Sequence, residues 1–183
     1  ELVEGEKFNR TVSVHENVKL TFIPNGHLPG AAMILVQIVY LDEVCENLLF
    51  TGDYNSQNMF FHVNVIPRWI RELPLTVITE STYGSSEEVE KGEKVPVLFY
   101  ENVSKAVKDG KNVIIPAFAL GRSQEVLYHL RRLQQLSKLS KKVPIYLDGK
   151  LAIEYMKLYK NGKITIKQSM QNFLPDNFKI VDQ

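Results

Sequence analysis

The stretch Asn25-Gly26-His27-Leu28-Pro29-Gly30-Ala31 follows an apolar, β-branched run at Val18–Ile23. Such a run predicts a strand, so His27 is expected on a loop that leaves a strand end, where a rigid sheet can direct a side chain. Gly26 and Gly30 flank the histidine, and glycine permits the close backbone approach that a crowded metal cavity needs. The loop therefore presents an imidazole at a position suited to a metal ligand.

A second stretch of this kind, Thr51-Gly52-Asp53-Tyr54, follows the strand-like run at Asn47–Phe50. A histidine and a carboxylate, each placed after a strand, suit a borderline metal such as zinc. On residues alone, ordinary turn chemistry is the more common explanation for a histidine in a Gly-Pro turn or an aspartate after a strand. Two ligands also fall short of the three or four that zinc takes.

Composition limits the classes of protein to consider. At 183 residues, with 44% hydrophobic and 23% charged residues, the chain resembles an ordinary globular protein of one or two domains. Its single cysteine, Cys45, excludes an internal disulfide, and its longest apolar stretch, Ala31–Leu41, is too short to span a bilayer. Because no basic and apolar leader opens the chain, a cytoplasmic location is expected.

The net charge of +1 is unevenly distributed along the chain. Residues 1–84 carry 5 Lys+Arg and 10 Asp+Glu, or −5, whereas residues 85–183 carry 17 and 11, or +6. A basic second half could attract a polyanion such as a nucleic acid. Lysine-rich, solvated helix faces would give the same composition, so charge alone does not decide between these alternatives.

The first half of the chain predicts a sheet of the kind found in a sandwich, with two hairpins followed by a short helix and a buried strand. The strands are expected at Thr11–Val14, Val18–Ile23, Ala31–Leu41, Asn47–Thr51 and Leu75–Thr79, and the helix within Ile66–Glu72.

The polar segment Ser85–Lys94 predicts a domain boundary, and after it helices alternate with strands. Alternation of this kind is typical of a parallel sheet with helical crossovers. Helices are expected at Val95–Lys108, Ser123–Leu139 and Leu151–Tyr159, and strands at Asn112–Pro116 and Val143–Leu147. The second of these helices is amphipathic, with one apolar face formed by Val126, Leu127, Leu130 and Leu133. The tail from Asn161 to Gln183 has no assignment.

Four motifs occur in a telling order: Gly26-His27-Leu28-Pro29-Gly30-Ala31, Leu49-Phe50-Thr51-Gly52-Asp53-Tyr54, Thr79-Glu80-Ser81-Thr82-Tyr83-Gly84 and Ile115-Pro116-Ala117-Phe118-Ala119-Leu120-Gly121-Arg122-Ser123-Gln124-Glu125. Together they resemble the β-CASP nucleases, RNA-processing members of the metallo-β-lactamase superfamily, and most of all the archaeal relatives of the catalytic subunit of the cleavage and polyadenylation specificity factor. The resemblance runs from about Val18 to the C-terminus. It implies an α/β fold in which residues 1–84 are part of a metallo-β-lactamase αββα sandwich and residues 85–183 are part of a β-CASP parallel-sheet α/β domain.

The resemblance also implies a catalytic centre of two zinc ions. By position in the motifs, His27 ligates one zinc ion and Asp53 bridges both. Two zinc ions would activate water and stabilise the charge that develops at phosphorus. Glu80 falls on an acidic motif that, in relatives, pairs with a later histidine that assists protonation of the leaving group. The alternative is that Glu80 accepts hydrogen bonds from Ser81, Thr82 or nearby backbone N–H groups.

Gly121, Arg122, Ser123 and Gln124 open the helix predicted after Asn112–Pro116. Free N–H groups, the positive end of the helix dipole and a guanidinium fork would together suit an RNA phosphate. The alternative is that Arg122 and Glu125 form a structural ion pair across the domain seam. The other histidines, at positions 15, 62 and 129, have no motif context, and the one at 129 is expected to be structural.

Two departures from the family pattern affect the function. The principal metal motif of the family, His-x-His-x-Asp-His, appears nowhere in this sequence, and neither do its two later histidine motifs. We therefore expect a segment of a zinc-dependent ribonuclease of RNA 3′-end processing or RNA decay, inactive by itself. The alternative is a non-catalytic RNA-binding or scaffolding subunit of an RNA-processing complex. A hydrolase of small esters is disfavoured by the Phe-Ala-Leu-Gly-Arg segment and the basic second half. The expected partners are RNA and either a second copy or an RNA-processing complex, and no membrane.

Overall fold

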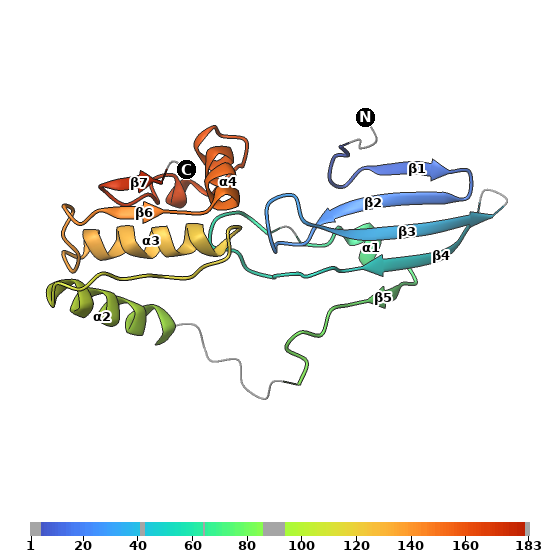
Figure 1. Cartoon of the computed structure of the whole chain (residues 1–183). Coiled ribbons are helices and arrows are strands. Elements are labelled where there is room, and N and C mark those ends of the chain that lie inside the picture. Colours follow the sequence, from blue (N-terminus) through green and yellow to red (C-terminus); the bar gives the residue numbers. More distant parts are fainter. Residues whose placement is uncertain (1–4, 41–42, 64, 86–93, 182–183) are drawn as a thin grey trace. The chain divides into compact units, whose positions relative to one another are not determined.

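The computed structural model describes residues 5–40, 43–63, 65–85 and 94–181, and Figure 1 shows the arrangement of the elements. The chain divides into two compact units, Glu1–Ser85 and Ser86–Gln183. The predicted boundary segment Ser85–Lys94 falls almost entirely outside the described residues. Within the described part of the chain, no helix has the length and apolar character needed to cross a membrane.

The first unit contains a five-stranded sheet and one short helix. Its strands follow one another in sequence order, as β1 (Thr11–His15), β2 (Val18–Pro24), β3 (Ala32–Tyr40), β4 (Glu43–Phe50) and β5 (Thr76–Ile78). The first four strands are antiparallel neighbours, whereas β5 pairs with β4 in parallel. The hairpin predicted between the first two strands is confirmed. The second hairpin also forms, although residues 41–42 of its turn lie outside the described residues.

Side-chain alternation places the core of this unit on one face of the sheet. Ile23 of β2 is opposite Met33 of β3, and Leu35 of β3 is opposite Leu49 of β4. These side chains are buried together with Ile70 of helix α1 (Arg68–Arg71). Because side chains alternate between faces with a period of two, this pairing register holds the four strand residues against the helix.

The expectation of a buried strand at Leu75–Thr79 is wrong in part. A strand forms there, but Val77 is 51% exposed and Ile78 is 45% exposed, and only Leu75 of this run packs against the core. A continuous apolar run predicts burial when layers cover both faces of a sheet. Among the described residues, β5 is the last strand of this sheet and pairs with β4 alone.

The second unit contains three helices and a pair of short parallel strands among its described residues. In chain order these are α2 (Lys94–Lys108), α3 (Arg122–Gln135), β6 (Ile145–Leu147), α4 (Lys150–Lys160), the 3₁₀ turn η1 (Gln168–Met170) and β7 (Phe178–Ile180). The three predicted helices are confirmed, although α3 ends before the predicted Leu139. Helix α3 buries Leu127, Leu130 and Leu133, the apolar stripe that its sequence indicates.

The strand predicted at Asn112–Pro116 does not form, and the tail that had no assignment provides a strand instead. A strand needs a neighbour to accept and donate its backbone hydrogen bonds. A cavity of about 420 Å³ has Val113 and Ile115 on one side and Leu147 of β6 on another. The strand that pairs with β6 is β7, from the C-terminal tail.

Candidate active site

The loops that carry His27, Asp53 and Glu80 all leave the same end of the first sheet. Strands β2 and β4 both run antiparallel to β3, so they point in the same direction, and β5 runs parallel to β4. His27 follows the end of β2, Asp53 follows the end of β4, and Glu80 follows the end of β5. The sheet topology therefore gathers three residues that are separated by 26 and 27 positions in the sequence.

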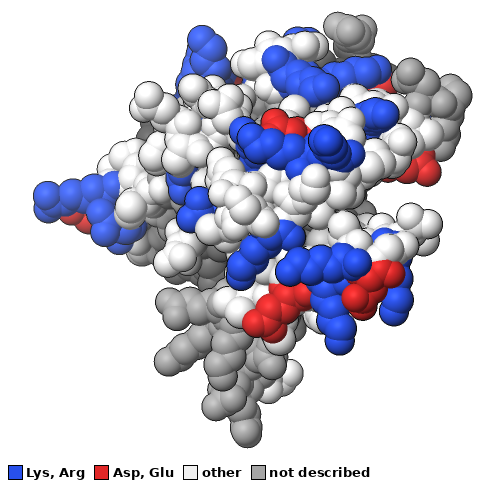
Figure 2. Space-filling view, turned by 90° about the vertical axis from the view of Figure 1, so that its left-hand side faces the viewer, with Lys and Arg blue, Asp and Glu red and all other residues white. Residues whose placement is uncertain are grey.

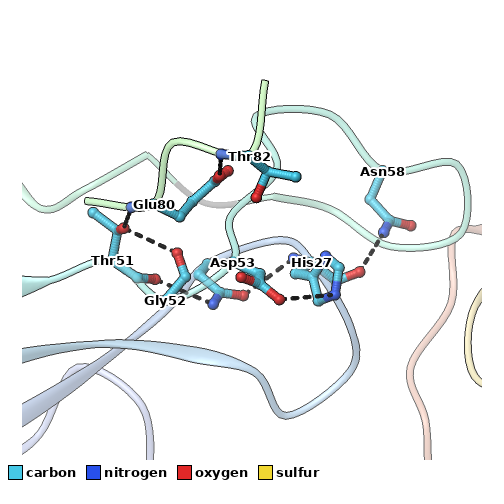
Figure 3. Close-up of polar contacts among 8 residues, drawn as sticks. His27, Thr51, Gly52, Asp53, Asn58, Glu80 and Thr82 are labelled. Carbon is cyan, nitrogen blue, oxygen red and sulfur yellow. Dashed lines mark hydrogen bonds and ion pairs between the residues drawn. The ribbon is translucent and has the colours of Figure 1, made fainter. Parts of the chain in front are cut away.

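His27 and Asp53 face each other across two of these loops, as Figure 3 shows. The imidazole Nε2 of His27 lies 4.0 Å from the carboxylate Oδ2 of Asp53. Both side chains are accessible, with exposed fractions of 46% for His27 and 74% for Asp53. At this distance the two groups do not form a strong direct ion pair, and each keeps lone pairs that a third atom could use.

The pair fits a shared metal ion in chemistry, because imidazole nitrogen and carboxylate oxygen are both zinc ligands. The 4.0 Å between the two atoms is longer than the roughly 3.4 Å that two bonds of about 2.1 Å span at a tetrahedral ion, so zinc binding would draw the two exposed side chains closer together. Zinc takes three or four such ligands. Within the part of the chain that the structure describes, no group of three or more His, Cys, Asp and Glu side chains is placed to hold a metal ion. The pair therefore provides two donors of such a site.

Asn25 shapes the His27 loop, and the sequence analysis did not single it out as a site residue. It is 4% exposed, and its side-chain oxygen accepts a hydrogen bond from the backbone N–H of His27 at 3.1 Å. Its side-chain nitrogen donates to the carbonyl of Thr51 at 3.4 Å, next to the Asp53 loop. Asn25 thus connects the two ligand-bearing loops, and the Asn-Gly turn dipeptide was the signal that could have indicated this role.

Asn58 supports the same loop from the following segment of chain. Its side-chain nitrogen donates to the carbonyl of Gly26 at 3.1 Å. It also donates to the carbonyl of His27 at 3.5 Å, the bond that Figure 3 draws. Its side-chain oxygen accepts the backbone N–H of Phe60 at 2.9 Å. No motif in the sequence pointed to Asn58, because the residues that it holds in the His27 loop lie 31 and 32 positions away.

Thr51 joins the Asp53 loop to the Glu80 loop. Its hydroxyl donates to the carbonyl of Gly52 at 2.9 Å and accepts the backbone N–H of Glu80 at 3.3 Å (Figure 3). Thr51 is 6% exposed, so these bonds replace hydration that the hydroxyl has lost. The threonine of the Thr-Gly-Asp stretch is thereby a positioning residue for both carboxylates.

The Glu80 carboxylate accepts a hydrogen bond from the backbone N–H of Thr82 at 2.8 Å. This bond lowers the pKa of Glu80 below its ordinary value, with smaller contributions from the Thr82 side chain and the charge of His27. This hydrogen bond is the structural role that the sequence offered as the alternative for Glu80. A catalytic role stays a prediction, and the ionised state that it requires is favoured by this environment.

The residues predicted to bind phosphate divide into an exposed arginine and a buried pair. Arg122 donates to the Glu125 carboxylate at 2.6 Å, so the ion pair forms, but as a contact within α3 and not across the domain seam as the alternative had it. Ser123 and Gln124 are 6% and 0% exposed, and their side chains donate to the carbonyls of Phe118 and Ala119. Phosphate binding by Gly121–Gln124 stays a prediction that now depends chiefly on the Arg122 side chain, which is 69% exposed.

The histidine at position 129 is half-buried on α3, in keeping with the structural role expected for it. Its Nδ1 lies 2.8 Å from the hydroxyl of Tyr100 on α2. Burial lowers the pKa of His129, and the nearby Glu125 carboxylate opposes that shift. The imidazole is therefore kept largely neutral near pH 7.

Comparison with known proteins places these features in a family. The model of the Beta-Casp domain matches residues 123–183. The chain is 35% identical over 159 residues to the Endoribonuclease ysh1 of Emericella nidulans, a match that covers 86% of the chain and 17% of the relative. It is 34% identical over 152 residues to an RNase J-like protein of Methanocaldococcus jannaschii, covering 82% of the chain and 34% of the relative.

A third relative, the Transcription termination factor FttA of Methanosarcina mazei, is 32% identical to the chain over 188 residues. This match covers 96% of the chain and 28% of the relative. The chain thus spans between about a sixth and a third of the length of these curated relatives. Fold, motifs and relatives agree on the class, a mixed α/β metallo-β-lactamase-type protein with a Beta-Casp domain. The chain belongs to the β-CASP family of RNA-processing nucleases.

Proposed function

We propose that this chain is part of a zinc-dependent ribonuclease that hydrolyses RNA phosphodiester bonds in RNA 3′-end processing or RNA decay. The observation that carries the proposal is the pairing of His27 Nε2 with Asp53 Oδ2, 4.0 Å apart on two loops at one end of the sheet. The family provides the reaction class, since relatives are named endoribonucleases. These loops are joined by buried hydrogen-bonding residues, as a preorganised site requires.

In this proposal each of the three site residues has a distinct role. His27 and Asp53 would hold the metal ion, His27 through an imidazole nitrogen and Asp53 through its carboxylate. Zinc bound there would supply Lewis-acid activation of water and stabilisation of the phosphorane charge. Glu80 orients a neighbouring proton donor through its carboxylate, and its lowered pKa keeps this carboxylate ionised.

RNA is the proposed substrate and partner, and the second unit supplies charge for binding it. Residues 85–183 contain 17 Lys+Arg and 11 Asp+Glu. Figure 2 looks onto the side on which α2 ends and β6 begins, and more Lys and Arg than Asp and Glu side chains cover that face. A positive face attracts a phosphate backbone over several ångströms. A second copy of the chain or an RNA-processing complex is the further partner that we propose.

Zinc titration of the purified chain by isothermal calorimetry tests the metal site. We expect weak binding, because two donors provide only part of the coordination that zinc needs. Both His27→Ala and Asp53→Ala should abolish the signal, whereas His15→Ala, which removes an exposed histidine from β1, should leave it unchanged. Tight binding of two equivalents that survives His27→Ala would show that other residues are the ligands.

A second candidate, a non-catalytic RNA-binding or scaffolding subunit, is favoured by the two-donor metal site among the described residues. A cleavage assay separates the two functions. A longer protein that contains this chain should cleave a labelled RNA in a zinc-dependent manner, and Asp53→Ala should abolish cleavage without loss of RNA binding. The 183-residue chain alone should show no sustained cleavage. RNA binding by the longer protein with no cleavage, with or without zinc, would support the scaffolding function instead.

A further inference from the structure

A pocket of about 360 Å³ lies within the second unit, between α2 and the beginning of α3. Its lining includes Phe99 of α2, Phe118 of the segment before α3, and Arg122, Glu125 and His129 of α3. This volume is at the lower end of the range for small-ligand pockets, about 300–1,000 Å³. The pocket therefore has room for one flat, ring-sized group.

Phe118 presents an aromatic ring to solvent from a backbone that is held in place. The residue is 81% exposed. Its carbonyl accepts two hydrogen bonds from Ser123, from the backbone N–H at 3.1 Å and from the hydroxyl at 2.8 Å. Ser123 is itself 6% exposed, so these bonds anchor the loop to α3 while the ring stays free to stack. Such an arrangement reduces the ordering cost of binding a planar ligand.

The pocket lining contributed by α2 and α3 is also aromatic and is fixed by contacts between these two helices. The rings of Phe99 and His129 lie 6.1 Å apart at an angle of 60°. Tyr100 engages the Nδ1 of His129 at 2.8 Å, which leaves Nε2 as the ring nitrogen that can meet a ligand. A wall of this kind offers apolar contact and a hydrogen-bonding edge to the same planar group.

The charges at the pocket balance each other. The Arg122 guanidinium donates to the Glu125 carboxylate at 2.6 Å, and both side chains line the pocket. A neutral pair attracts an isolated anion less than a free arginine would, but it offers both donors and acceptors to a polar ring edge. The site therefore suits a nucleobase better than a phosphate.

We propose that this pocket binds one unpaired nucleobase of single-stranded RNA, stacked on the ring of Phe118. The inference deepens the proposed function and rests on it, in that RNA is taken as the substrate. Base–aromatic stacking is a common means by which proteins hold single-stranded nucleic acid. RNA is favoured over an acidic or apolar peptide because the unit that contains the pocket has a charge excess of +6, from 17 Lys+Arg and 11 Asp+Glu, and a phosphate backbone complements that charge along its whole length.

Fluorescence anisotropy tests the pocket with a labelled single-stranded RNA of about eight nucleotides, in EDTA so that metal-dependent cleavage is prevented. Phe118→Ala should weaken binding by about 5- to 100-fold, since one stacked base is lost. Phe118→Trp should retain binding, whereas Phe118→Leu should lose it because a leucine cannot stack. Ile114→Ala is the matched control, because Ile114 is an apolar residue of the same segment that is 91% exposed and does not line the pocket.

Two further measurements separate base stacking from general attraction. The slope of log affinity against log salt should be unchanged in Phe118→Ala, because no charge is removed. An abasic backbone of the same length should bind the wild-type chain and Phe118→Ala equally. Equal affinity of the two proteins for the ordinary RNA would overturn the inference, and so would full retention of binding by Phe118→Leu.

Failure of the base-pocket proposal can be distinguished from failure of the proposed zinc-dependent function. The zinc titration depends on His27 and Asp53 of the first unit, and the anisotropy measurement depends on Phe118 of the second unit. Intact RNA binding that does not depend on Phe118 would overturn the base pocket and leave RNA as the substrate. Absence of any RNA binding at low salt, together with zinc binding that depends on His27, would overturn the pocket and leave the metal site.

Discussion

Gly26 and Gly30 flank His27 and form a natural pair for testing how tightly the loop is packed. Both have positive φ, 76° at Gly26 and 87° at Gly30, so alanine meets a similar backbone cost at either position. A Cβ at Gly26 would overlap the Asn55 carbonyl oxygen, whereas a Cβ at Gly30 would meet nothing within 4 Å. The difference between the two variants therefore reports the close packing alone.

We expect Gly30→Ala to reduce the free energy of unfolding by about 1–2 kcal/mol, the usual cost of a left-handed alanine. Gly26→Ala should cost more and should weaken zinc binding as well, since the loop must move to relieve the overlap. Urea denaturation and the zinc titration measure these two effects. Equal stability of the two variants would mean that the Asn55 segment yields easily and does not hold the loop.

Among the elements, α3 organises the second unit through its buried stripe. Leu133 is 0% exposed, whereas Leu136, at the C-terminal end of the same helix, is 43% exposed. Leu133→Ala should therefore lower the free energy of unfolding by about 2–5 kcal/mol, and Leu136→Ala by about 0.5 kcal/mol or less. Chemical denaturation followed by circular dichroism provides the comparison. Similar losses for both variants would contradict the assignment of the buried face.

The contact between α2 and α3 makes the second unit sensitive to pH through His129. Burial lowers the pKa of His129 in the folded state. As the pH falls below the ordinary pKa of histidine, the unfolded state therefore binds more protons at this residue than the folded state does. Stability contributed by the neutral imidazole is present above that ordinary value, about 6.5, and is lost as the pH falls toward the lowered folded value. Acidification should thus destabilise the wild-type chain.

Thermal melts between about pH 7.5 and pH 5.5 measure this sensitivity. His129→Gln should show a smaller loss of melting temperature on acidification than the wild-type chain. His15→Gln, which changes an exposed histidine of the first unit, should keep the wild-type pH dependence. The assignment fails if the two variants lose stability in parallel.

For the molecule as a whole, the charge asymmetry between the units predicts which arginines contribute to RNA binding. Arg122 and Arg68 are both exposed helical arginines, paired with Glu125 and Glu72 respectively. Arg122 lies in the basic unit and Arg68 in the acidic one. Arg122→Ala should reduce RNA affinity because it removes part of the pocket lining, and it should change the salt slope little because Glu125 already pairs with the guanidinium, whereas Arg68→Ala should change neither. Anisotropy at several salt concentrations measures both quantities, and an affinity unchanged by Arg122→Ala would remove Arg122 from the RNA contacts.

Local pattern was sufficient for most of the elements, whereas the roles of the candidate site residues came from the motifs and stay predictions. Period-two alternation and turn residues predicted the first hairpin, and period-3.6 spacing predicted the buried leucines of α3. The motifs around His27, Asp53 and Glu80 identified the family, which the Beta-Casp match and the relatives confirm. These features depend on residues that are near one another in the chain, so a single sequence contains the information.

Long-range pairing decided the rest. The apolar run at Asn112–Pro116 has the composition of a strand, yet β6 pairs with β7, more than thirty residues away in the tail. Val77 and Ile78 read as buried but lie exposed on β5, the last strand of its sheet. Asn25 joins the His27 and Asp53 loops through a bond to Thr51. Strand neighbours, burial and hydrogen-bond partners are set by contacts between distant segments, and only the folded chain brings those segments together.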